Sequence, residues 1–377
     1  MASTHVTTLT LDLSRIRENL RVVRNHLKIE GDVEPGIIAV IKGFGYGTDD
    51  TVLAKVYAEE GVDYLAVAYV EEGIQLREAG VEGSIMVLNP DPSTFDKLGE
   101  YKLEPSMISL GHLEDFINWI ARNNISGEVL EPIHVNVNTG MHRLGFGLED
   151  ITRLITLLNS IEGLRLGTVY THLASTENPD NDGKTTKQLL SFKMFCSSLR
   201  IGLKNVQLNK FKTHALNSSG VARFPKHGMD YVRVGLILLG SELSKAGLAL
   251  KPAVFFRTVV TQVQTVPPGQ GVGYGYADPS ESEREIAWLP VGYADGYPRS
   301  LSDGRGRVWI NGQEAPVVGR VCMDLTAVDV TGLGVQVGYE AELFGDNISI
   351  EKVSEEAGTI PYELIARVHQ RVIRRVV

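Results

Sequence analysis

The stretch Ile37-Ile38-Ala39-Val40-Ile41, followed directly by Lys42-Gly43-Phe44-Gly45-Tyr46-Gly47, decides the fold. Five consecutive apolar residues, most of them β-branched, predict a strand that is buried on both faces. The glycines that follow permit a tight turn. Lys42 is therefore expected at the carboxyl end of a buried strand, where α/β folds bind ligands. Burial there would lower the pKa of the amine and make it a nucleophile, whereas an isolated lysine would only end the strand and reach into water.

The composition is that of an ordinary soluble protein with more than one domain. The chain has 377 residues, of which 43% are hydrophobic and 22% charged, and no stretch has the length of a membrane span. There is no secretory signal, and the two cysteines, Cys196 and Cys322, suit a reducing compartment, so we expect a cytoplasmic protein with no membrane partner. A net charge of −9 argues against nucleic acid as a partner. The basic cluster Arg371, Arg374 and Arg375 is interpreted as a solvated face.

Buried apolar runs alternate with amphipathic helical patterns in the first part of the chain. The predicted strands are eight, at 37–42, 64–70, 84–89, 105–110, 133–138, 166–172, 210–216 and 231–237. Helical spacing of apolar residues occurs over 50–60, 113–122, 151–161 and 187–199. Eight such units predict a closed (β/α)8 TIM-type barrel over residues 1–245, with a doubly wound open sheet as the alternative.

The pattern changes after residue 245, where short β-rich runs are separated by turn residues. These runs are 254–266, 285–291, 306–310, 315–322 and 339–344. They predict an antiparallel β domain over residues 246–377. The alternating run 7–13 precedes the first helix and is a candidate to pair with this second domain.

Several chemically capable side chains follow or end predicted barrel strands. The carboxyl ends of barrel strands converge at one mouth, so these side chains are expected to share a site. They are Lys42, Arg143, His172, Ser218 and Arg233. The segment Asn217-Ser218-Ser219-Gly220 and Gly235 follow the last two strands, where this architecture often holds a phosphate. A lysine nucleophile beside a phosphate cradle points to pyridoxal phosphate, held by the lysine as a Schiff base.

Short motifs are distributed over both predicted domains. In the barrel they are Ala39-Val40-Ile41-Lys42 with Tyr46-Gly47, the segment 134–146 (HVNVNTGMHRLGF), Thr171-His172-Leu173-Ala174, the segment 214–218 (HALNS) and Val232-Arg233-Val234-Gly235. In the second domain they are Val272-Gly273-Tyr274-Gly275, the segments 291–296 (VGYADG) and 319–324 (GRVCMD), and Pro361-Tyr362-Glu363. Each motif is weak alone, but their order and combination are specific. Over essentially its whole length the chain resembles the fold-type III pyridoxal-phosphate alanine racemase family.

The resemblance implies a role for each barrel residue. Lys42 would carry the cofactor and serve as one of two catalytic bases. His172 would lie against the cofactor ring. Arg233 would face the ring nitrogen, which must then accept a hydrogen bond because a guanidinium has no lone pair and stays protonated. The phosphate would be held by Tyr46, Ser218, Gly235, Leu236 and Tyr362, with Asn217 beside them.

The resemblance also implies a role for the second domain. Tyr274 would be the second base, because racemisation removes a proton from one face of Cα and returns it on the other. In the family this tyrosine comes from the partner subunit, so a homodimer with shared active sites is implied. Tyr293 and Met323 would also reach the bound substrate, and Arg143 would position its carboxylate and lower the pKa of the tyrosine. The implied reaction interconverts L-alanine and D-alanine and supplies D-alanine for peptidoglycan.

Two positions depart from the family pattern, and other functions remain open. Asn136 stands where many members have a carbamylated lysine, so Arg143 needs another partner, and Gly43-Phe44-Gly45 stands where smaller or polar residues are usual. One alternative is a racemase of serine or of broader specificity. A second is a pyridoxal-phosphate decarboxylase, which Arg233 and Tyr274 disfavour. A third is a non-enzymatic cofactor-binding barrel, which would lack the β domain.

Some residues have a structural interpretation beside the functional one. His134 and His214 are interpreted as hydrogen-bonded structural histidines rather than catalytic groups. Tyr293 and Met323 are open to interpretation as ordinary packing residues. The nine histidines show no metal-ligand spacing, and the acidic stretch 177–182 has the pattern of a polar loop, so no metal is expected.

Overall fold

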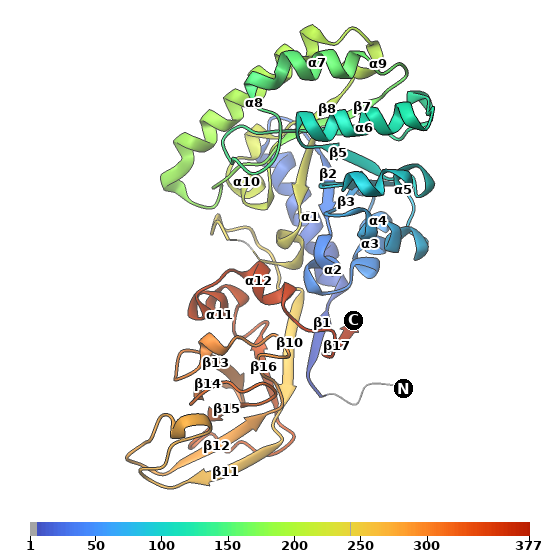
Figure 1. Cartoon of the computed structure of the whole chain (residues 1–377). Coiled ribbons are helices and arrows are strands. Elements are labelled where there is room, and N and C mark those ends of the chain that lie inside the picture. The colour runs from blue at the N-terminus through green and yellow to red at the C-terminus, as the bar shows by residue number, and fades with distance from the viewer. Residues whose placement is uncertain (1–5, 242) are drawn as a thin grey trace.

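Eight parallel strands close into a barrel in the computed structural model, which describes residues 6–241 and 243–377. The strands are β2 (Gly36–Val40), β3 (Tyr64–Val67), β4 (Ser84–Val87), β5 (Glu104–Met107), β6 (Ile133–Val137), β7 (Leu166–Thr171), β8 (Lys212–His214) and β9 (Tyr231–Val234). Each strand pairs with the next one along the chain, and β9 pairs with β2 to close the ring. The predicted barrel is confirmed, and the closed order excludes the open-sheet alternative (Figure 1).

Helices follow the strands and form the outer layer of the barrel (Figure 1). They are α1 (Leu13–Glu30) before β2, then α2 (Lys42–Gly47), α3 (Asp50–Glu59), α4 (Val70–Glu78), α5 (Phe95–Glu100), α6 (Leu110–Arg122), α7 (Ile151–Asn159), α8 (Asp182–Gly202), α9 (Val206–Asn209) and α10 (Ser218–Arg223). Their apolar faces decide this placement, since on α6, for example, Leu113, Phe116 and Ile120 are buried. Ser109 begins that helix by accepting a hydrogen bond from the His112 N–H at 3.2 Å. The four helices predicted from the sequence correspond to α3, α6, α7 and α8.

Several barrel strands end earlier than the sequence predicted. The predicted strand 231–237 stops at Val234, and the short helix η6 (Leu236–Leu239) follows. The prediction 105–110 likewise runs into α6, which begins at Leu110. The segment 236–239 is as apolar as a strand because it packs against the core, and apolar content alone does not separate the two. The strands are therefore shorter and the mouth loops longer than predicted.

The second sheet has nine strands and lies at the other end of the molecule (Figure 1). Its strands are β1 (Thr8–Leu11), β10 (Val254–Val259), β11 (Gln262–Val266), β12 (Arg284–Leu289), β13 (Arg307–Ile310), β14 (Gln313–Val318), β15 (Thr326–Asp329), β16 (Glu340–Phe344) and β17 (Ile373–Val376). β1 pairs antiparallel with β10 and parallel with β17. The sheet is mostly antiparallel, but the parallel pair and the four-residue strands β15 and β17 were not predicted.

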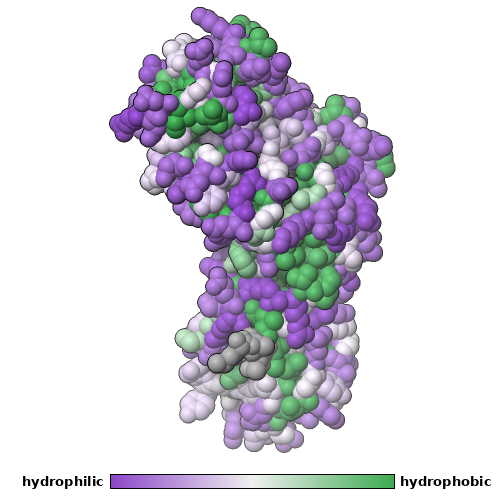
Figure 2. Space-filling model, turned by 90° about the vertical axis from the view of Figure 1, so that its right-hand side faces the viewer, coloured by the Kyte–Doolittle hydropathy of each residue, from purple (hydrophilic) through white to green (hydrophobic). Residues whose placement is uncertain are grey.

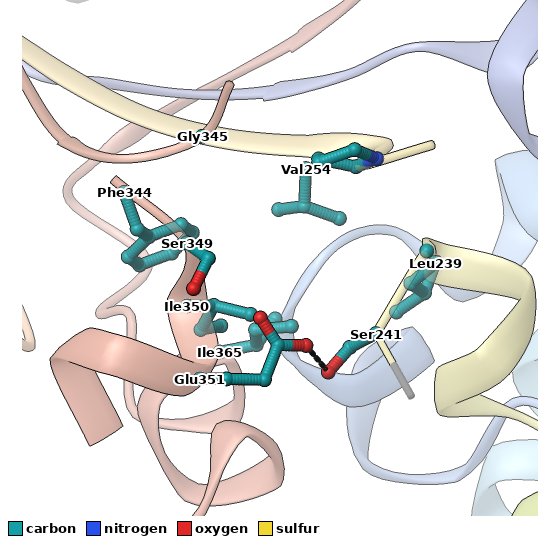
Figure 3. A pocket seen from close by; sticks show the side chains of 11 residues that line it. Leu239, Ser241, Val254, Phe344, Gly345, Ser349, Ile350, Glu351 and Ile365 are labelled. Atoms are coloured by element: carbon teal, nitrogen blue, oxygen red, sulfur yellow. Dashed lines mark hydrogen bonds between the residues drawn. The ribbon is translucent and has the colours of Figure 1, made fainter. Parts of the chain in front are cut away.

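The barrel and the second sheet share one continuous hydrophobic core. Helices α11 (Ile350–Ala357) and α12 (Pro361–Ala366) lie at the junction, and α12 packs against α2. A cavity of about 20 Å³, enough for one water molecule, lies there beside the hydrogen bond from the Ser241 hydroxyl to Glu351 (Figure 3). Because the core is continuous, the barrel mouth and the second sheet are held in a fixed relation.

The surface differs in character from this core. Figure 2 shows a face on which hydrophilic residues predominate and apolar residues gather in separate patches. Among residues 6–241 and 243–377, none of the helices combines the length and the apolar character that crossing a bilayer requires.

Candidate active site

The residues after β2 form a left-handed turn that presents Lys42 at the barrel mouth. From Gly43 to Tyr46, four successive residues have positive φ angles of 64°, 55°, 61° and 57°. Glycine adopts this region freely, whereas Phe44 and Tyr46 incur a steric cost there. At Gly47, a Cβ atom would lie 2.3 Å from the Ile365 carbonyl oxygen. The alternation of glycine with aromatic residues thus builds the turn and allows it to pack against α12.

Lys42 lies in a buried and largely cationic environment. Burial lowers the pKa of its amine, and the positive charges of Arg143 and Arg233 lower it further. The carboxylate of Glu72 acts in the opposite direction. A lowered pKa increases the fraction of neutral amine, which is the nucleophilic and basic form.

Glu72 is a mouth residue that the sequence analysis missed. Its carboxylate accepts hydrogen bonds from the backbone N–H groups of Gly43 and Ala68, both at 2.6 Å. These bonds tie the Lys42 turn to the start of α4, where Glu72 is the third helical residue. Glutamate often reaches back from this position to the backbone before a helix, and that pattern is the signal that could have identified it.

Arg233 lies beneath the mouth and is only 5% exposed. Its terminal nitrogens donate to the Thr171 carbonyl oxygen at 2.7 Å and to Nδ1 of His214 at 2.6 Å, and Nη2 lies 3.3 Å from Nδ1 of His172. Burial lowers the pKa of Arg233 to about 10, so the guanidinium remains charged at neutral pH. Burial and the charge of Arg233 lower the pKa of His172 to about 3, so this ring is neutral.

A cluster of hydroxyl groups surrounds Gly235 at the same mouth. The Gly235 N–H donates to the Ser218 hydroxyl at 3.3 Å, and the rings of Tyr46 and Tyr362 lie 5.6 Å apart between centroids. A Cβ atom at position 235 would lie 2.3 Å from the Tyr46 hydroxyl, so a larger residue would displace this tyrosine. Burial raises the pKa of both tyrosines, which keeps them neutral hydrogen-bond donors.

Two further predicted residues flank this cluster. Leu236 is buried and begins η6 directly after Gly235. Asn217 precedes α10, and its side-chain oxygen accepts from the Gly220 N–H at 2.9 Å and from the Thr176 hydroxyl at 2.7 Å. Asn217 therefore fixes the start of the segment that carries Ser218.

The loop that carries Arg143 is anchored on β6. The Phe146 N–H donates to the backbone carbonyl oxygen of Asn136 at 2.9 Å, which closes the loop between them. Asn136 itself is 9% exposed. The charge of Arg143 lowers the pKa of both Lys42 and His172, so its side chain belongs to the mouth.

Three predicted residues form an exposed group of their own in the second sheet. Tyr274 lies in η7 (Tyr274–Tyr276) after β11 and is 68% exposed, and Met323 is 52% exposed. Both line an open depression of about 590 Å³, to which no barrel residue contributes. The Tyr293 N–H donates to the Cys322 carbonyl oxygen at 3.1 Å, which places Tyr293 beside Met323. The adjacent strands β11 and β12 lie at the end of the sheet that is far from the barrel (Figure 1).

The carboxyl-terminal arginines are only partly a solvated face, because Arg371 and Arg375 are exposed as predicted whereas Arg374 is half-buried. Arg371 donates to both carboxylate oxygens of the buried Asp295, at 2.6 and 2.9 Å, and to Asp324 at 2.7 Å. Arg374 donates to the Gly47 carbonyl oxygen at 2.9 Å, at the end of the Lys42 turn. The carboxyl terminus therefore braces both the loop after Met323 and the turn after Lys42, through contacts that local sequence does not reveal.

His134 and His214 are fully buried, and both ring nitrogens of each have hydrogen-bond partners. The interpretation as hydrogen-bonded structural histidines is confirmed. The mouth thus brings together Lys42, Tyr46, Arg143, His172, Ser218, Arg233, Gly235, Leu236 and Tyr362, with Asn217 beside them. Tyr274, Tyr293 and Met323 stay apart from it.

Two family models match the chain. The model described as alanine racemase, N-terminal domain, matches residues 11–242, and the one described as alanine racemase, C-terminal domain, matches residues 253–376. The alanine racemase of Halothermothrix orenii is 35% identical, over 98% of this chain and 97% of that protein. Alanine racemase 1 of Clostridium acetobutylicum is 34% identical, over 97% of this chain and 93% of that protein.

Solved structures extend the similarity to the fold. The alanine racemase from D-cycloserine-producing Streptomyces lavendulae has a TM-score of 0.90 at 28% identity, over 100% of this chain and 98% of that one. The alanine racemase from Bartonella henselae, solved with covalently bound pyridoxal phosphate, has a TM-score of 0.87 at 28% identity, over 99% of each chain. The similarity covers the barrel and the second sheet alike.

Proposed function

The chain belongs to the alanine racemase family, and from that premise we propose that it interconverts L-alanine and D-alanine with two bases. Lys42 serves one face of the substrate Cα, and Tyr274 of the partner subunit serves the other. The observation that carries this proposal is the separation of the two groups, because Lys42 is half-buried in a cationic mouth whereas Tyr274 is 68% exposed in the second sheet. Racemisation needs a base on each face, and a second copy of the chain can supply the one that a single copy holds apart.

Pyridoxal phosphate is the proposed cofactor, because the donors at the mouth fit it. The hydroxyls of Tyr46, Ser218 and Tyr362 are the neutral donors that a phosphate group binds. The backbone N–H groups of Gly235 and Leu236 add two more, with Asn217 holding the adjoining segment. Arg233 and the neutral His172 are proposed to contact the cofactor ring. When bound, this cofactor withdraws electrons from the substrate and so makes its Cα proton acidic.

The residues around Lys42 suit it for proton transfer. Its lowered pKa leaves part of the amine neutral and able to accept a proton. Arg143 is proposed to bind the substrate carboxylate and to position Tyr274 of the partner subunit. Tyr293 and Met323 of the partner subunit are proposed to reach the bound substrate.

A homodimer with shared active sites follows from this assignment. The proposal is supported by the exposure of Tyr274, Met323 and Leu325, which together give the depression a surface that a second copy would cover. The wider proposal includes a cytoplasmic protein that supplies D-alanine for peptidoglycan. It also divides the chain into domains 1–245 and 246–377, with strand 7–13 on the second sheet.

Hydrogen exchange at Cα tests the proposed function directly. The purified chain is incubated with pyridoxal phosphate and L-alanine in heavy water, and deuterium at Cα is followed together with the appearance of D-alanine. Deuterium at Cα and D-alanine should appear in parallel, because a base that has exchanged its proton with heavy water returns deuterium to Cα. Exchange with serine but not with alanine would favour the racemase of other specificity, and the absence of exchange with either would overturn the proposal.

A further inference from the structure

The interior of the barrel is divided into an apolar side and a polar side. On strands β2 to β4 it is filled by Ile38, Ala66 and Met86. On strands β5 to β9 it is filled by a row of polar residues that are all at most 5% exposed, namely Glu104, His134, Thr168, His214 and Arg233. Polar groups at this depth persist only when they are hydrogen-bonded, so the partners of this row need an account.

The polar row is one unbroken chain of hydrogen bonds. Nη1 of Arg233 lies 2.6 Å from Nδ1 of His214, and Nε2 of His214 lies 2.9 Å from the Thr168 hydroxyl. The same hydroxyl lies 2.8 Å from Nδ1 of His134, whose Nε2 lies 3.1 Å from the Glu104 carboxylate. Glu104 is the first residue of β5 and Arg233 lies near the end of β9, so the chain runs from the far end of the barrel to the mouth.

With both imidazole rings neutral, the direction of each hydrogen bond follows from the Arg233 donor. A guanidinium only donates, so Nδ1 of His214 accepts and the proton of that neutral ring is on Nε2. The Thr168 hydroxyl accepts a hydrogen bond from His214. Its single proton is then directed to Nδ1 of His134, to which the hydroxyl donates a hydrogen bond. The proton of His134 is then on Nε2 and points to Glu104, so all donors face the same way.

Aromatic side chains pack against both imidazole rings of the hydrogen-bond chain and hold these rings in place. Tyr170 stacks on His214 with an interplanar angle of 5° and a centroid distance of 4.9 Å. Tyr64 packs edge-on against His134 at 5.9 Å. Burial and the charge of Arg233 lower the pKa of His214, in keeping with a neutral ring.

Among residues 6–241 and 243–377, no carboxylate is a hydrogen-bond partner of Arg233. The five hydrogen-bond contacts of its terminal nitrogens go to backbone carbonyl oxygens and to the rings of His172 and His214. The carboxylate joined to it through buried hydrogen bonds is that of Glu104, four hydrogen bonds away with three residues between. None of these five contacts uses Nε.

We propose that Glu104 and Thr168 are positioning residues for the mouth, which hold His134 and His214 in one tautomer and thereby fix Arg233 as a donor beneath the cofactor ring. This inference rests on the proposed function, since it assigns Arg233 to the cofactor. Loss of the Thr168 hydroxyl removes the acceptor of His214 and the donor of His134 together. Arg233 would then keep its bonds to backbone carbonyl oxygens, but His214, which accepts from its Nη1, would no longer be held by a hydrogen bond at its other ring nitrogen.

Two matched pairs of variants test the proposal in the full chain. Thr168→Val removes the hydroxyl and Thr168→Ser keeps it, while Glu104→Leu removes the acceptor and Glu104→Gln keeps an oxygen in its place. The tautomers of ring-labelled histidines are read by nitrogen-15 NMR, with signals assigned through His134→Gln and His214→Gln. Affinity for pyridoxal phosphate is measured by absorbance titration of each protein.

We expect both rings of the parent chain to carry the proton on Nε2. Thr168→Val and Glu104→Leu should disturb these tautomers and weaken cofactor binding by about tenfold, whereas Thr168→Ser and Glu104→Gln should stay close to the parent. A proton on Nδ1 of either parent ring would overturn the proposal, and this measurement decides even where a variant fails to fold. Equal cofactor affinity of the Val and Ser variants would also overturn it.

The outcome is separable from that of the proposed function. A parent chain with the expected tautomers that binds the cofactor but does not racemise alanine would refute the proposed function and leave the hydrogen-bond chain standing. Racemisation of alanine by a chain with the opposite tautomers would refute this inference alone.

Discussion

At the barrel mouth Arg233 is 5% exposed and its terminal nitrogens are fixed by backbone and imidazole acceptors, whereas Tyr274 in the second sheet is 68% exposed beside an open depression. The first arrangement is complete within one chain, and its donors are already in place for a ligand. The second arrangement leaves the depression beside Tyr274 open on the surface of the single chain. The difference indicates that changes at the mouth should act within each subunit, and that changes around Tyr274 should act across a subunit boundary.

Removal of the Lys42 amine should have the largest effect and should be confined to one subunit. Lys42→Ala is expected to lower alanine racemisation by about 10⁴-fold, because it removes both a base and the attachment point of the cofactor. D-alanine formation and the visible absorbance of the bound cofactor measure the two losses separately. Lys55→Ala, at an exposed lysine of α3, is the matched control and should retain activity. Retention of activity by Lys42→Ala would remove the lysine from the mechanism.

Removal of the Tyr274 hydroxyl should have the next largest effect and should be shared between subunits. Tyr274→Phe is expected to keep the cofactor absorbance but to slow racemisation by about 10² to 10³-fold, because one face of Cα loses its base. Tyr276→Phe, at a side chain that is 85% exposed, is the control.

Mixing the two inactive variants sharpens this comparison further. Equal amounts of Lys42→Ala and Tyr274→Phe chains should recover roughly a quarter of the parent activity, because half of the dimers would have one intact site of two. The mixture is refolded or exchanged together and assayed for D-alanine. A mixture that stays inactive would contradict the assignment of the two bases to different chains.

A larger residue at Gly235, within the hydroxyl cluster of Tyr46, Ser218 and Tyr362, should have a smaller effect, again within one subunit. Gly235→Ala places a Cβ atom 2.3 Å from the buried Tyr46 hydroxyl, so this tyrosine must move away from its place. We expect pyridoxal phosphate to bind about 10 to 100-fold more weakly, because one of several hydrogen-bond donors is misplaced. Gly111→Ala in α6 has open space around its Cβ position and should bind the cofactor as the parent does. Equal titration curves for the two variants would exclude Gly235 from the cradle.

The sequence was most informative where the structure is most buried. Strands that are covered on both faces are often apolar throughout, and residues 37–41 follow that rule, so they predicted both a buried strand and the position of Lys42 at its end. The same rule failed at 236–239, where four buried leucines and isoleucines form a short helix rather than the end of a strand. Burial was thus predictable from composition, but backbone conformation within a buried loop was not.

The residues that brace the site could not be predicted, because their partners are remote in sequence. Arg371 pairs with Asp295 and Asp324, which are 76 and 47 residues away. Glu104 and Thr168 look like ordinary strand residues until the barrel closes and aligns them with His134. Tyr274 is the opposite case. Its motif identified it from local sequence, but in the single chain it lies in a different group of residues from Lys42.

The smallest expected effect concerns the pH dependence of stability, and it tests whether the mouth is preformed in one chain. His172 has a pKa of about 3 when folded, against about 6.5 in an unfolded chain. Between these values the unfolded chain binds more protons, so the free energy of unfolding falls as the pH falls, by about 1.4 kcal/mol per pH unit for this group. His172→Asn should remove that part of the slope in urea unfolding of the cofactor-free chain from pH about 6.5 to about 4.5. An equal slope in the His172→Asn variant and the parent would mean that the imidazole is not held neutral beside Arg233, and the contrast between a preformed mouth and an unfinished partner surface would fail.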